Sequence, residues 1–392
     1  MNPSQRRYDI DALRVIAFGL LILYHCGMFY VADWGWHVKS EHLSVLLQEP
    51  MRFTNQWRMS LLFIISGLAV SIVWQRYTPG QLARKRLWRL GLPLVFGALV
   101  IIVPQPYYEI LSQDVIERGY FKFWWQYLTY HDFPGEAWRG EDSLTTWNHL
   151  WYLPYVLLYT LVLTAFGALM PKAVLAARQR FQQLRGGAIL LLPLLPLMLY
   201  GNFVFPHWPY IDHGLLNDFY AHALFGTLFL FGFLIGRADA IWTSIKQWRW
   251  VWLLLGIMSY VLLRAQSVWV SEEPSVIINQ LSMLNIYVNR LSWILALLAW
   301  SFVLLNRPLP GLAYCTAAVF PWYVLHQTIT VAAGYEFSQL GLGPVVEPIA
   351  VLGTTIVGCA VLYEFVIRRN RVLSVLFGGP IVTQPKAADA VD

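Results

Sequence analysis

The stretch Asp11-Ala-Leu-Arg14-Val-Ile-Ala-Phe-Gly-Leu-Leu-Ile-Leu-Tyr24-His25 decides the fold class. No charged side chain lies between Arg14 and His25, and the apolar run continues to residue 31. A run of this length provides the roughly 20 mostly apolar residues that a helix needs to cross a bilayer. It predicts a transmembrane helix over 12–31 that carries an arginine near its start and a histidine further along.

The composition of the whole chain is that of a polytopic membrane protein. Charged residues make up 13% and hydrophobic residues 57% of its 392 residues, whereas a soluble globular protein has about 25% charged residues. So few charges could not solvate the surface of a soluble fold of this size. The apolar content also excludes a disordered chain, and three cysteines are too few for a disulfide scaffold.

Ten apolar stretches are candidates for membrane-spanning helices. They are 12–31, 59–75, 91–110, 149–170, 187–204, 219–237, 249–266, 290–306, 311–334 and 345–367. We therefore expect an all-α polytopic integral membrane protein with about ten transmembrane helices. Residues 1–371 would form a single transmembrane domain, and residues 372–392 a disordered cytoplasmic tail. The first apolar run is long and lacks a small-residue cleavage site, so no cleavable signal peptide is expected.

Lysine and arginine concentrate on one side of this topology. With ten spans both termini lie on the same side as the loops after spans 2, 4, 6 and 8, and these segments hold 19 of the 28 Lys and Arg residues. By the positive-inside rule this side is cytoplasmic. We therefore expect both termini in the cytoplasm, in a multi-pass protein of a bacterial inner membrane. The net charge of +6 then reflects topology, and no nucleic-acid partner is expected.

Arg14 and His25 are candidate functional residues because ionisable side chains inside a membrane helix are costly. They are eleven positions apart, which is three helical turns with about 20° of residual rotation. Both therefore lie on one face, about 16 Å apart along the helix axis, with Arg14 near the cytoplasmic entrance and His25 in the outer half. Taken singly, Arg14 is also explained by snorkelling and His25 by a satisfied buried histidine. Their shared face argues against that explanation for the pair.

The histidines of the chain all map to the outer half of the spans or to outer loops. They are His25, His37, His42, His131, His149, His207, His213, His222 and His326. His25, His149 and His326 belong to spans 1, 4 and 9, so we expect them to converge on one outward-facing cavity, together with Asn148 and Tyr323. His42, His207 and His213 are better explained as interfacial anchors. No HExxH, HxH or paired-Cys spacing occurs, so neither a metal site nor a permanently bound cofactor is expected.

The second span and the segment after it carry further candidates. Arg58 stands at the outer start of the span. Ser66-Gly67 is a small-residue pair that lets another helix or a ligand approach the backbone closely, which makes Ser66 a candidate substrate contact. Four cations follow the span: Arg84, Lys85, Arg86 and Arg89. They suit anionic lipid headgroups or a phosphate-rich ligand.

These elements, in this order, resemble the membrane acyltransferase type 3 family over roughly residues 8–367. The family has an Arg and a His separated by ten residues on its first helix, a Phe-x-x-Ser-Gly element, an Arg-x-x-Arg-Leu-x-x-Pro run and a His-Leu-Trp element. The matching positions are Arg14 and His25, 63–67, 86–93 and 149–151. Residues 36–40 and 58–59 are similar to the glucan biosynthesis branch of the family, whose members are associated with succinylation of osmoregulated periplasmic glucans.

The resemblance implies an O-acyltransferase that moves an acyl group, succinyl or acetyl, from a cytoplasmic acyl-CoA to a hydroxyl of a periplasmic or cell-surface glycan. His25 would be the general base, and His149, His326, Tyr323 or Asn148 would stabilise the oxyanion. The cations at 84–89 and Arg14 would hold the CoA phosphates, and Arg58 would bind a succinyl carboxylate. Glycan-synthesis partners would be separate proteins in or near the bilayer.

A transporter or flippase for a glycan or lipid-linked precursor is the alternative function. It would also place charges in the spans and a polar cavity near the middle of the membrane. Its usual marks are inverted repeats and helices broken by Gly or Pro in matching halves, and the sequence shows neither. The sequence does not identify the residue that orients His25. Asp11 is too far along the helix, and Glu109 and Asp218 would require tertiary contacts.

Overall fold

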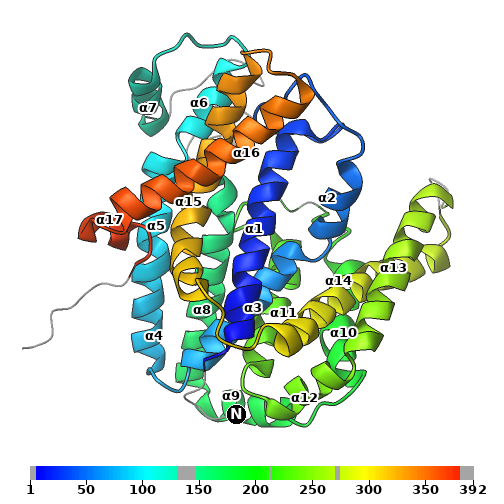
Figure 1. Cartoon of the computed structure of the whole chain (residues 1–392). Helices are drawn as coiled ribbons and strands as arrows, with labels where there is room; N and C mark the ends of the chain where they lie inside the picture. The colour runs from blue at the N-terminus through cyan, green and yellow to red at the C-terminus, as the bar shows by residue number, and fades with distance from the viewer. Residues whose placement is uncertain (1–5, 130–145, 210, 212, 270–273, 380–392) are drawn as a thin grey trace, which may run out of the picture.

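The computed structural model describes residues 6–129, 146–209, 211, 213–269 and 274–379. Within these ranges the regular secondary structure is helical, and the only β-type pairing is an isolated bridge between Val31 and Ser44. Figure 1 shows a bundle in which α1 (Tyr8–Tyr30) runs beside α15 (Leu312–Ser338), with α16 (Gly343–Val361) crossing obliquely in front. The expected all-α architecture is therefore confirmed.

Each of the ten predicted spans coincides with helix. Besides α1, α15 and α16 these are α3 (Arg58–Val73), the helices α4 to α6 within Pro79–Leu111, α8 (Tyr152–Leu169), α10 (Ala188–Phe203), α11 (Phe219–Ile235), α13 (Arg249–Trp269) and α14 (Val276–Leu304). Seven helical stretches of the described chain are long and apolar enough to cross a membrane, or eight if α11 and α12 (Asp239–Gln247), which bend by 108°, form one span. The chain is thus a polytopic membrane protein, and ten remains the predicted number of spans.

The third long stretch begins earlier than expected and is not a regular α-helix. It runs through α4 (Pro79–Arg86), a π-helical turn (Leu87–Gly91), α5 (Leu92–Phe96), a second π-helical turn (Gly97–Ile101) and α6 (Pro104–Leu111). Each π-helical turn shortly precedes a proline, Pro93 or Pro104. A proline ring clashes with the carbonyl four residues earlier, and widening the preceding turn relieves that clash. The basic residues at 84–89, expected in a loop, therefore lie on this helix.

Helices α3 and α11 pack closely along their length, and two glycines make this possible. A Cβ atom added to Gly67 would overlap the carbonyl oxygen of Phe229 and lie 2.7 Å from the backbone nitrogen of Phe233. A Cβ atom at Gly232 would likewise overlap the carbonyl oxygen of Ile64. The small residue in Ser66-Gly67 thus serves a helix–helix contact, as the sequence suggested for such a pair.

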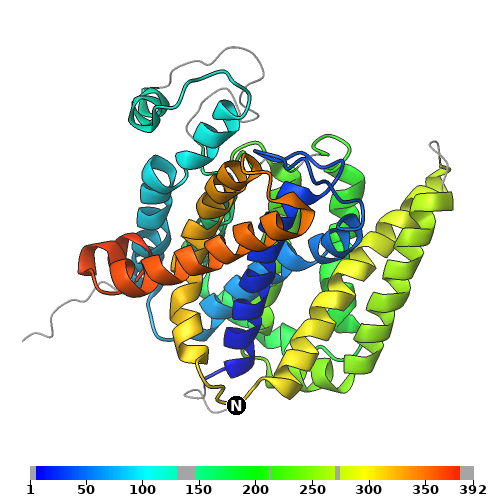
Figure 2. The same ribbon diagram turned by 45° about the horizontal axis from the view of Figure 1, so that its top comes forward.

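Helix α14 also begins earlier than predicted, at Val276 rather than near residue 290. Arg290 consequently lies in the middle of α14 and not at its start. Helices α13 and α14 form a hairpin that leans away from the rest of the bundle (Figures 1 and 2). Asn289 joins them by donating to the backbone oxygen of Gly256, at 3.1 Å. This contact gives the amide nitrogen of Asn289 an acceptor in surroundings that are otherwise apolar.

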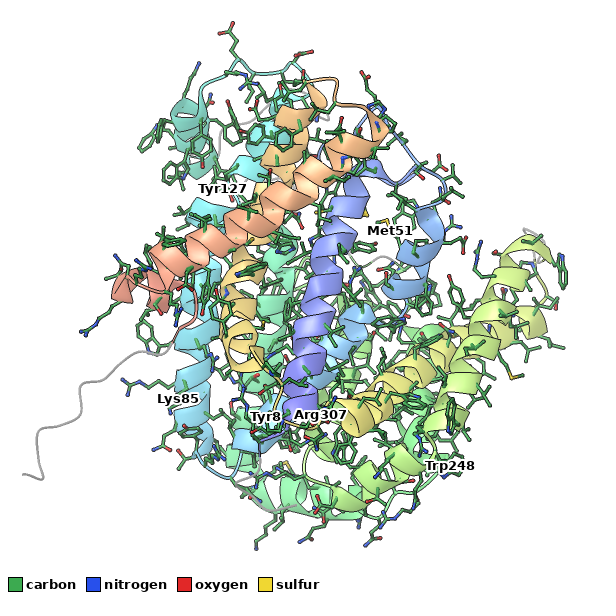
Figure 3. The ribbon with its side chains drawn as sticks, viewed as in Figure 1. Tyr8, Met51, Lys85, Tyr127, Trp248 and Arg307 are labelled. Carbon is green, nitrogen blue, oxygen red and sulfur yellow. The ribbon has the colours of Figure 1, made fainter. Side chains whose placement is uncertain are left out.

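Several short helices connect or follow the long ones along the chain. They are α2 (Gln48–Asn55), α7 (Tyr120–Leu128), α9 (Pro171–Phe181), α12 and α17 (Arg371–Leu376). Figure 3 shows Tyr8, Lys85, Trp248 and Arg307 toward one end of the molecule, while Met51 and Tyr127 lie toward the other. The sequence predicts a disordered tail from residue 372, but α17 is helical because Asn370 caps it by accepting from the backbone N–H groups of Val372 and Leu373. The tail beyond residue 379 lies outside the described residues.

Candidate functional site

A cavity of about 390 Å³ lies among α1, α3, α11, α14, α15 and the segment before α8, and we call it the histidine cavity. Six of its lining residues carry polar side chains of particular interest: His25, Arg58, Asn148, His149, Tyr323 and Gln327. The first five were candidate site residues from the sequence, and they come from α1, α3, α15 and the 3₁₀ turn Asn148–Trp151. The structure therefore brings residues from distant parts of the chain to one cavity.

His25 and His326 form a directly hydrogen-bonded pair between α1 and α15. Their rings are stacked with 5.0 Å between centroids, and Nδ1 of His25 lies 2.8 Å from Nε2 of His326. Nδ1 of His326 is 2.8 Å from the backbone oxygen of Tyr323, which only accepts hydrogen bonds, so this nitrogen carries the proton. Nε2 of neutral His326 must then accept from His25. This leaves Nε2 of His25 unprotonated, the form that a general base needs.

His149 stands next to this pair, but both of its ring nitrogens are engaged by the protein. Its ring lies 5.3 Å from that of His326, at 89°. Nδ1 accepts from the side-chain amide of Gln105 at 3.1 Å, and Nε2 donates to the backbone oxygen of Val324 at 3.2 Å. The hydroxyl of Tyr323 donates to the backbone oxygen of His149 at 2.7 Å. His149 and Tyr323 therefore hold the wall of the cavity, and their donors are not free to bind an oxyanion.

A second histidine, His37, is held by a carboxylate. Nδ1 of His37 donates to Oε2 of Glu109, a buried side chain of α6. Nε2 of His37 lies 3.2 Å from the amide nitrogens of both Asn148 and Gln327. Because the hydrogen bond to the carboxylate keeps the proton on Nδ1, Nε2 is the acceptor in both contacts. His37 thus links a buried acid to two residues that line the histidine cavity.

Two arginines, Arg58 buried and Arg290 half-buried, line the same cavity without an acidic partner among the described residues. The side chain of Arg58 is 3% exposed and lies over the ring of Tyr24, with Cζ 3.5 Å from the ring centroid. Its Nε and Nη1 atoms have no hydrogen-bond partner in the described part of the chain. Arg290 donates from Nε to the backbone oxygen of Gln56 at 2.8 Å, whereas its Nη1 is unpartnered there. Buried cations of this kind favour an anionic ligand, because an unpaired buried charge is costly.

Lys39, two residues after His37, is a third cation in this region, but it binds elsewhere. Its Nζ donates to the backbone oxygens of Met28, at 2.8 Å, and Val31, at the end of α1. It compensates carbonyls that the end of the helix leaves unpaired. Burial lowers the pKa of Lys39 to about 8. It is not among the residues that line the histidine cavity.

The predicted donor-binding cations divide into two groups. Arg14, Arg86 and Arg89 lie close enough to influence one another electrostatically, and Arg14 also pairs with Asp11 at 3.2 Å. Lys85 instead lies over the ring of Tyr77, 3.7 Å from its centroid, and points away from the bundle (Figure 3). Arg84 is exposed. The structure therefore brings only part of the basic run to Arg14.

Ser66, a candidate substrate contact, is placed differently from the histidines. Its hydroxyl lies 2.5 Å from that of Tyr152, and the residue is not among those that line the histidine cavity. Tyr152 in turn donates to the backbone oxygen of Leu62 at 3.0 Å. Because Arg14 and Arg86 both act electrostatically on Tyr152, Ser66 belongs to the neighbourhood of the arginine cluster.

For some residues, the sequence does not predict the position that the structure shows. His213 was expected at the interface, but it lines the histidine cavity and lies against Trp151, with 4.3 Å between ring centroids. Gln105 and Gln327 were not candidates, although an amide inside an apolar run is a signal that could have identified them. Asp218 caps α11 and is unrelated to His25. His131 lies outside the described residues.

Comparisons with known proteins agree with this arrangement. The model of the family described as an acyltransferase domain matches residues 7–364. The proteins named glucans biosynthesis protein C of Shigella dysenteriae serotype 1 and of Escherichia coli strain K12 are each 24% identical to this chain, over 97% of the chain and 96% of the relative. No solved structure matches. Since the family match covers nearly the whole chain, this polytopic protein belongs to the membrane acyltransferase type 3 family and is a membrane acyltransferase.

Proposed function

We propose that this acyltransferase moves an acyl group from acyl-CoA to a hydroxyl of a glucan, and that the transfer takes place at the histidine cavity. The single observation that carries the proposal is the His25–His326 pair, which leaves an unprotonated Nε2 on a residue that lines the cavity. The acceptor class is taken from the relatives, which are named for glucan biosynthesis. The glucan would be periplasmic, the protein would lie in a bacterial inner membrane, and the glucan-synthesis proteins would be separate chains.

The chemistry follows from the position of that nitrogen. Nε2 of His25 accepts the proton of the acceptor hydroxyl as its oxygen attacks the thioester carbonyl and the new C–O bond forms. The tetrahedral intermediate collapses by breaking the C–S bond. The CoA thiolate then takes the proton back from Nε2, so that protons and electrons balance. His326 supports the transient imidazolium because its Nε2 accepts the Nδ1–H of His25.

The donor is supported by the basic cluster of Arg14, Arg86 and Arg89. CoA carries several phosphate charges, and guanidinium groups bind phosphates with short, charge-assisted hydrogen bonds. An apolar cavity of about 230 Å³ lies between α1 and α15 and is lined by residues from Val15, next to Arg14, up to His326. An extended pantetheine arm spans on the order of 15–20 Å, which is comparable to the distance between Arg14 and His25 along α1.

The acyl group is proposed to be anionic, with succinyl as the first candidate. Arg58 and Arg290 place unpartnered guanidinium nitrogens at a cavity where an acetyl group would need none. A succinyl group carries a carboxylate, which Arg can bind bidentately. This pairing would offset the cost of burying both charges.

The test is a reconstitution of the purified protein with radiolabelled succinyl-CoA and a glucan oligosaccharide. We expect labelled oligosaccharide and an equal amount of released CoA. If CoA is released but the oligosaccharide stays unlabelled, the acceptor assignment is wrong. If labelled oligosaccharide supplied in vesicles crosses the membrane unmodified and no CoA is released, the protein transports its ligand instead.

A further inference from the structure

Gln327 has a buried oxygen with no partner among the described residues. Its side chain is 2% exposed and lines the histidine cavity. Its amide nitrogen donates twice, to Oε1 of Gln105 at 3.1 Å and to Nε2 of His37 at 3.2 Å. Oε1 makes no hydrogen bond to the described part of the chain. Buried polar atoms are nearly always satisfied, so this oxygen points to a ligand that donates a hydrogen bond.

The orientation of the Gln327 amide is fixed first by Glu109. An amide has similar atoms at its two ends, so its orientation is read from the groups around it. The carboxylate of Glu109 accepts a hydrogen bond from the Nδ1–H of His37, and Nε2 of neutral His37 is therefore an acceptor. Only the amide nitrogen of Gln327 can donate to that acceptor.

Gln105 fixes the same orientation from the other side. Its own amide nitrogen donates to Nδ1 of His149 at 3.1 Å and to Oγ1 of Thr328 at 2.7 Å. The hydroxyl of Thr328 donates to the backbone oxygen of Ile101 at 2.7 Å, so Oγ1 accepts from Gln105. Oε1 of Gln105 is consequently the atom that faces Gln327. Two acceptors hold the nitrogen of Gln327, and its oxygen is left unpartnered.

We propose that Oε1 of Gln327 accepts a hydrogen bond from a hydroxyl group of the acceptor sugar beside His25. Glu109 and His37 are positioning residues that keep this oxygen available. This inference rests on the proposed function and adds a subsite to it. A sugar offers many O–H donors, whereas the thioester and an ionised acyl carboxylate offer none. Gln327 also follows His326 directly on α15, so a sugar held by Oε1 would lie close to the histidine pair. The oxygen therefore selects the acceptor and not the reacting end of the donor.

The test compares binding of a glucan oligosaccharide with binding of its fully O-methylated derivative, which keeps the ring but has no hydroxyl donors. Calorimetry on the full chain in detergent, without acyl-CoA, gives both affinities. The wild type should prefer the free oligosaccharide, and Gln327→Met should reduce that preference about tenfold, as expected for one lost hydrogen bond. Glu109→Gln should reduce it similarly, because the altered His37 tautomer no longer holds the amide nitrogen.

Glu347→Gln is the matched control. Glu347 is as buried as Glu109, at 2% exposed, but its basic neighbour is His42 at 4.0 Å and it does not line the histidine cavity. This variant should keep the wild-type preference. Unchanged preference in Gln327→Met would overturn the subsite. Unchanged preference in Glu109→Gln alone would overturn the positioning role, and this variant also tests the proposal if Gln327→Met does not fold.

The binding measurement separates this inference from the proposed reaction. Hydroxyl-dependent binding without transfer from succinyl-CoA would reject the reaction and keep the subsite. Transfer by the wild type, together with equal binding of the free and methylated sugars, would reject the subsite and keep the reaction.

Discussion

Nδ1 of His25 lies 2.8 Å from Nε2 of His326, and no described carboxylate contacts either ring. A general-base histidine is commonly oriented by an acid, which also stabilises the imidazolium. Here the partner is a second, neutral imidazole whose far nitrogen is bound to the backbone oxygen of Tyr323. The carboxylate available nearby, Glu109, is used by His37 instead. The positive charge that His25 acquires when Nε2 is protonated is therefore stabilised by a ring and a carbonyl dipole.

This pairing predicts a strong coupling between the two histidines. His25→Ala should lower acyl transfer by about 10²–10⁴-fold, the usual contribution of a general base. His326→Ala should lower it less, because Nε2 of His25 remains but its tautomer is no longer fixed. The double variant should be no slower than His25→Ala, since residues that act as one unit are not additive. Transfer rates of the three purified variants are compared with the wild type.

Gel filtration and thermal unfolding of the same preparations serve as controls for folding. Wild-type turnover by a well-folded His25→Ala variant would exclude His25 as the base. Additive losses in the double variant would show that His326 acts separately.

Much of this fold and part of this site can be predicted from the sequence, because hydropathy is a local property. Every apolar run became helix, and the convergence of His25, His149 and His326 followed from their depth in the predicted spans. The His37–Glu109 contact joins residues 72 positions apart and depends on how α6 packs. Which nitrogen of each ring carries a proton depends on backbone oxygens that appear only in the folded chain. No local pattern encodes such contacts.

The basic run illustrates a different limit of prediction from hydropathy. A hydropathy pattern locates apolar residues, but it does not show that the helix begins at Pro79, before the cations. Once Arg86 and Lys85 lie on a helix, their neighbouring positions point about 100° apart. In the sequence the two residues are equivalent neighbouring cations, whereas in the structure their side chains lie on different sides of the helix.

That separation predicts different effects of two similar substitutions on donor binding. Arg86→Ala should weaken binding of succinyl-CoA, because Arg86 stands beside Arg14 and Arg89. Lys85→Ala should change it little, since Lys85 lies over Tyr77 on the outside of the helix. Added salt should weaken wild-type binding and reduce the difference between the variants. Calorimetry with succinyl-CoA measures all of these. Equal affinities for Arg86→Ala and the wild type would favour a lipid-headgroup role for the cluster.

The close contact between α3 and α11 predicts a large effect on stability. Gly67→Ala places a methyl group against the backbone of Phe229 and Phe233, which cannot rotate away as a side chain can. Overpacking of this kind typically costs about 1–3 kcal/mol, so the midpoint of thermal unfolding in detergent should fall. Gly19→Ala, on α1, is the control because nothing lies within 4 Å of the added atom. Equal midpoints for the two variants would contradict the observed packing.

The unpartnered guanidinium of Arg58 predicts a change in acyl-group selectivity. Arg58→Ala should reduce transfer from succinyl-CoA far more than transfer from acetyl-CoA, because only the succinyl group brings a carboxylate that needs a buried cation. Arg58→Lys should recover part of the succinyl activity, since lysine keeps the charge but lacks the planar pair of donors. The measurement is a competition between the two labelled donors for one oligosaccharide.

Arg52→Ala is the matched control. Arg52 lies on α2, the short helix that precedes Arg58 at the start of α3. Arg52 is paired with Glu49 at 3.4 Å and with Oε1 of Gln48 at 2.8 Å, and it does not line the histidine cavity. Its loss should leave the ratio of succinyl to acetyl transfer unchanged. If Arg58→Ala loses both activities equally, the guanidinium supports the structure through Tyr24 and does not read the acyl group. Exclusive acetyl transfer by the wild type would reject the succinyl assignment, because the acetyl donor brings no carboxylate to the cavity.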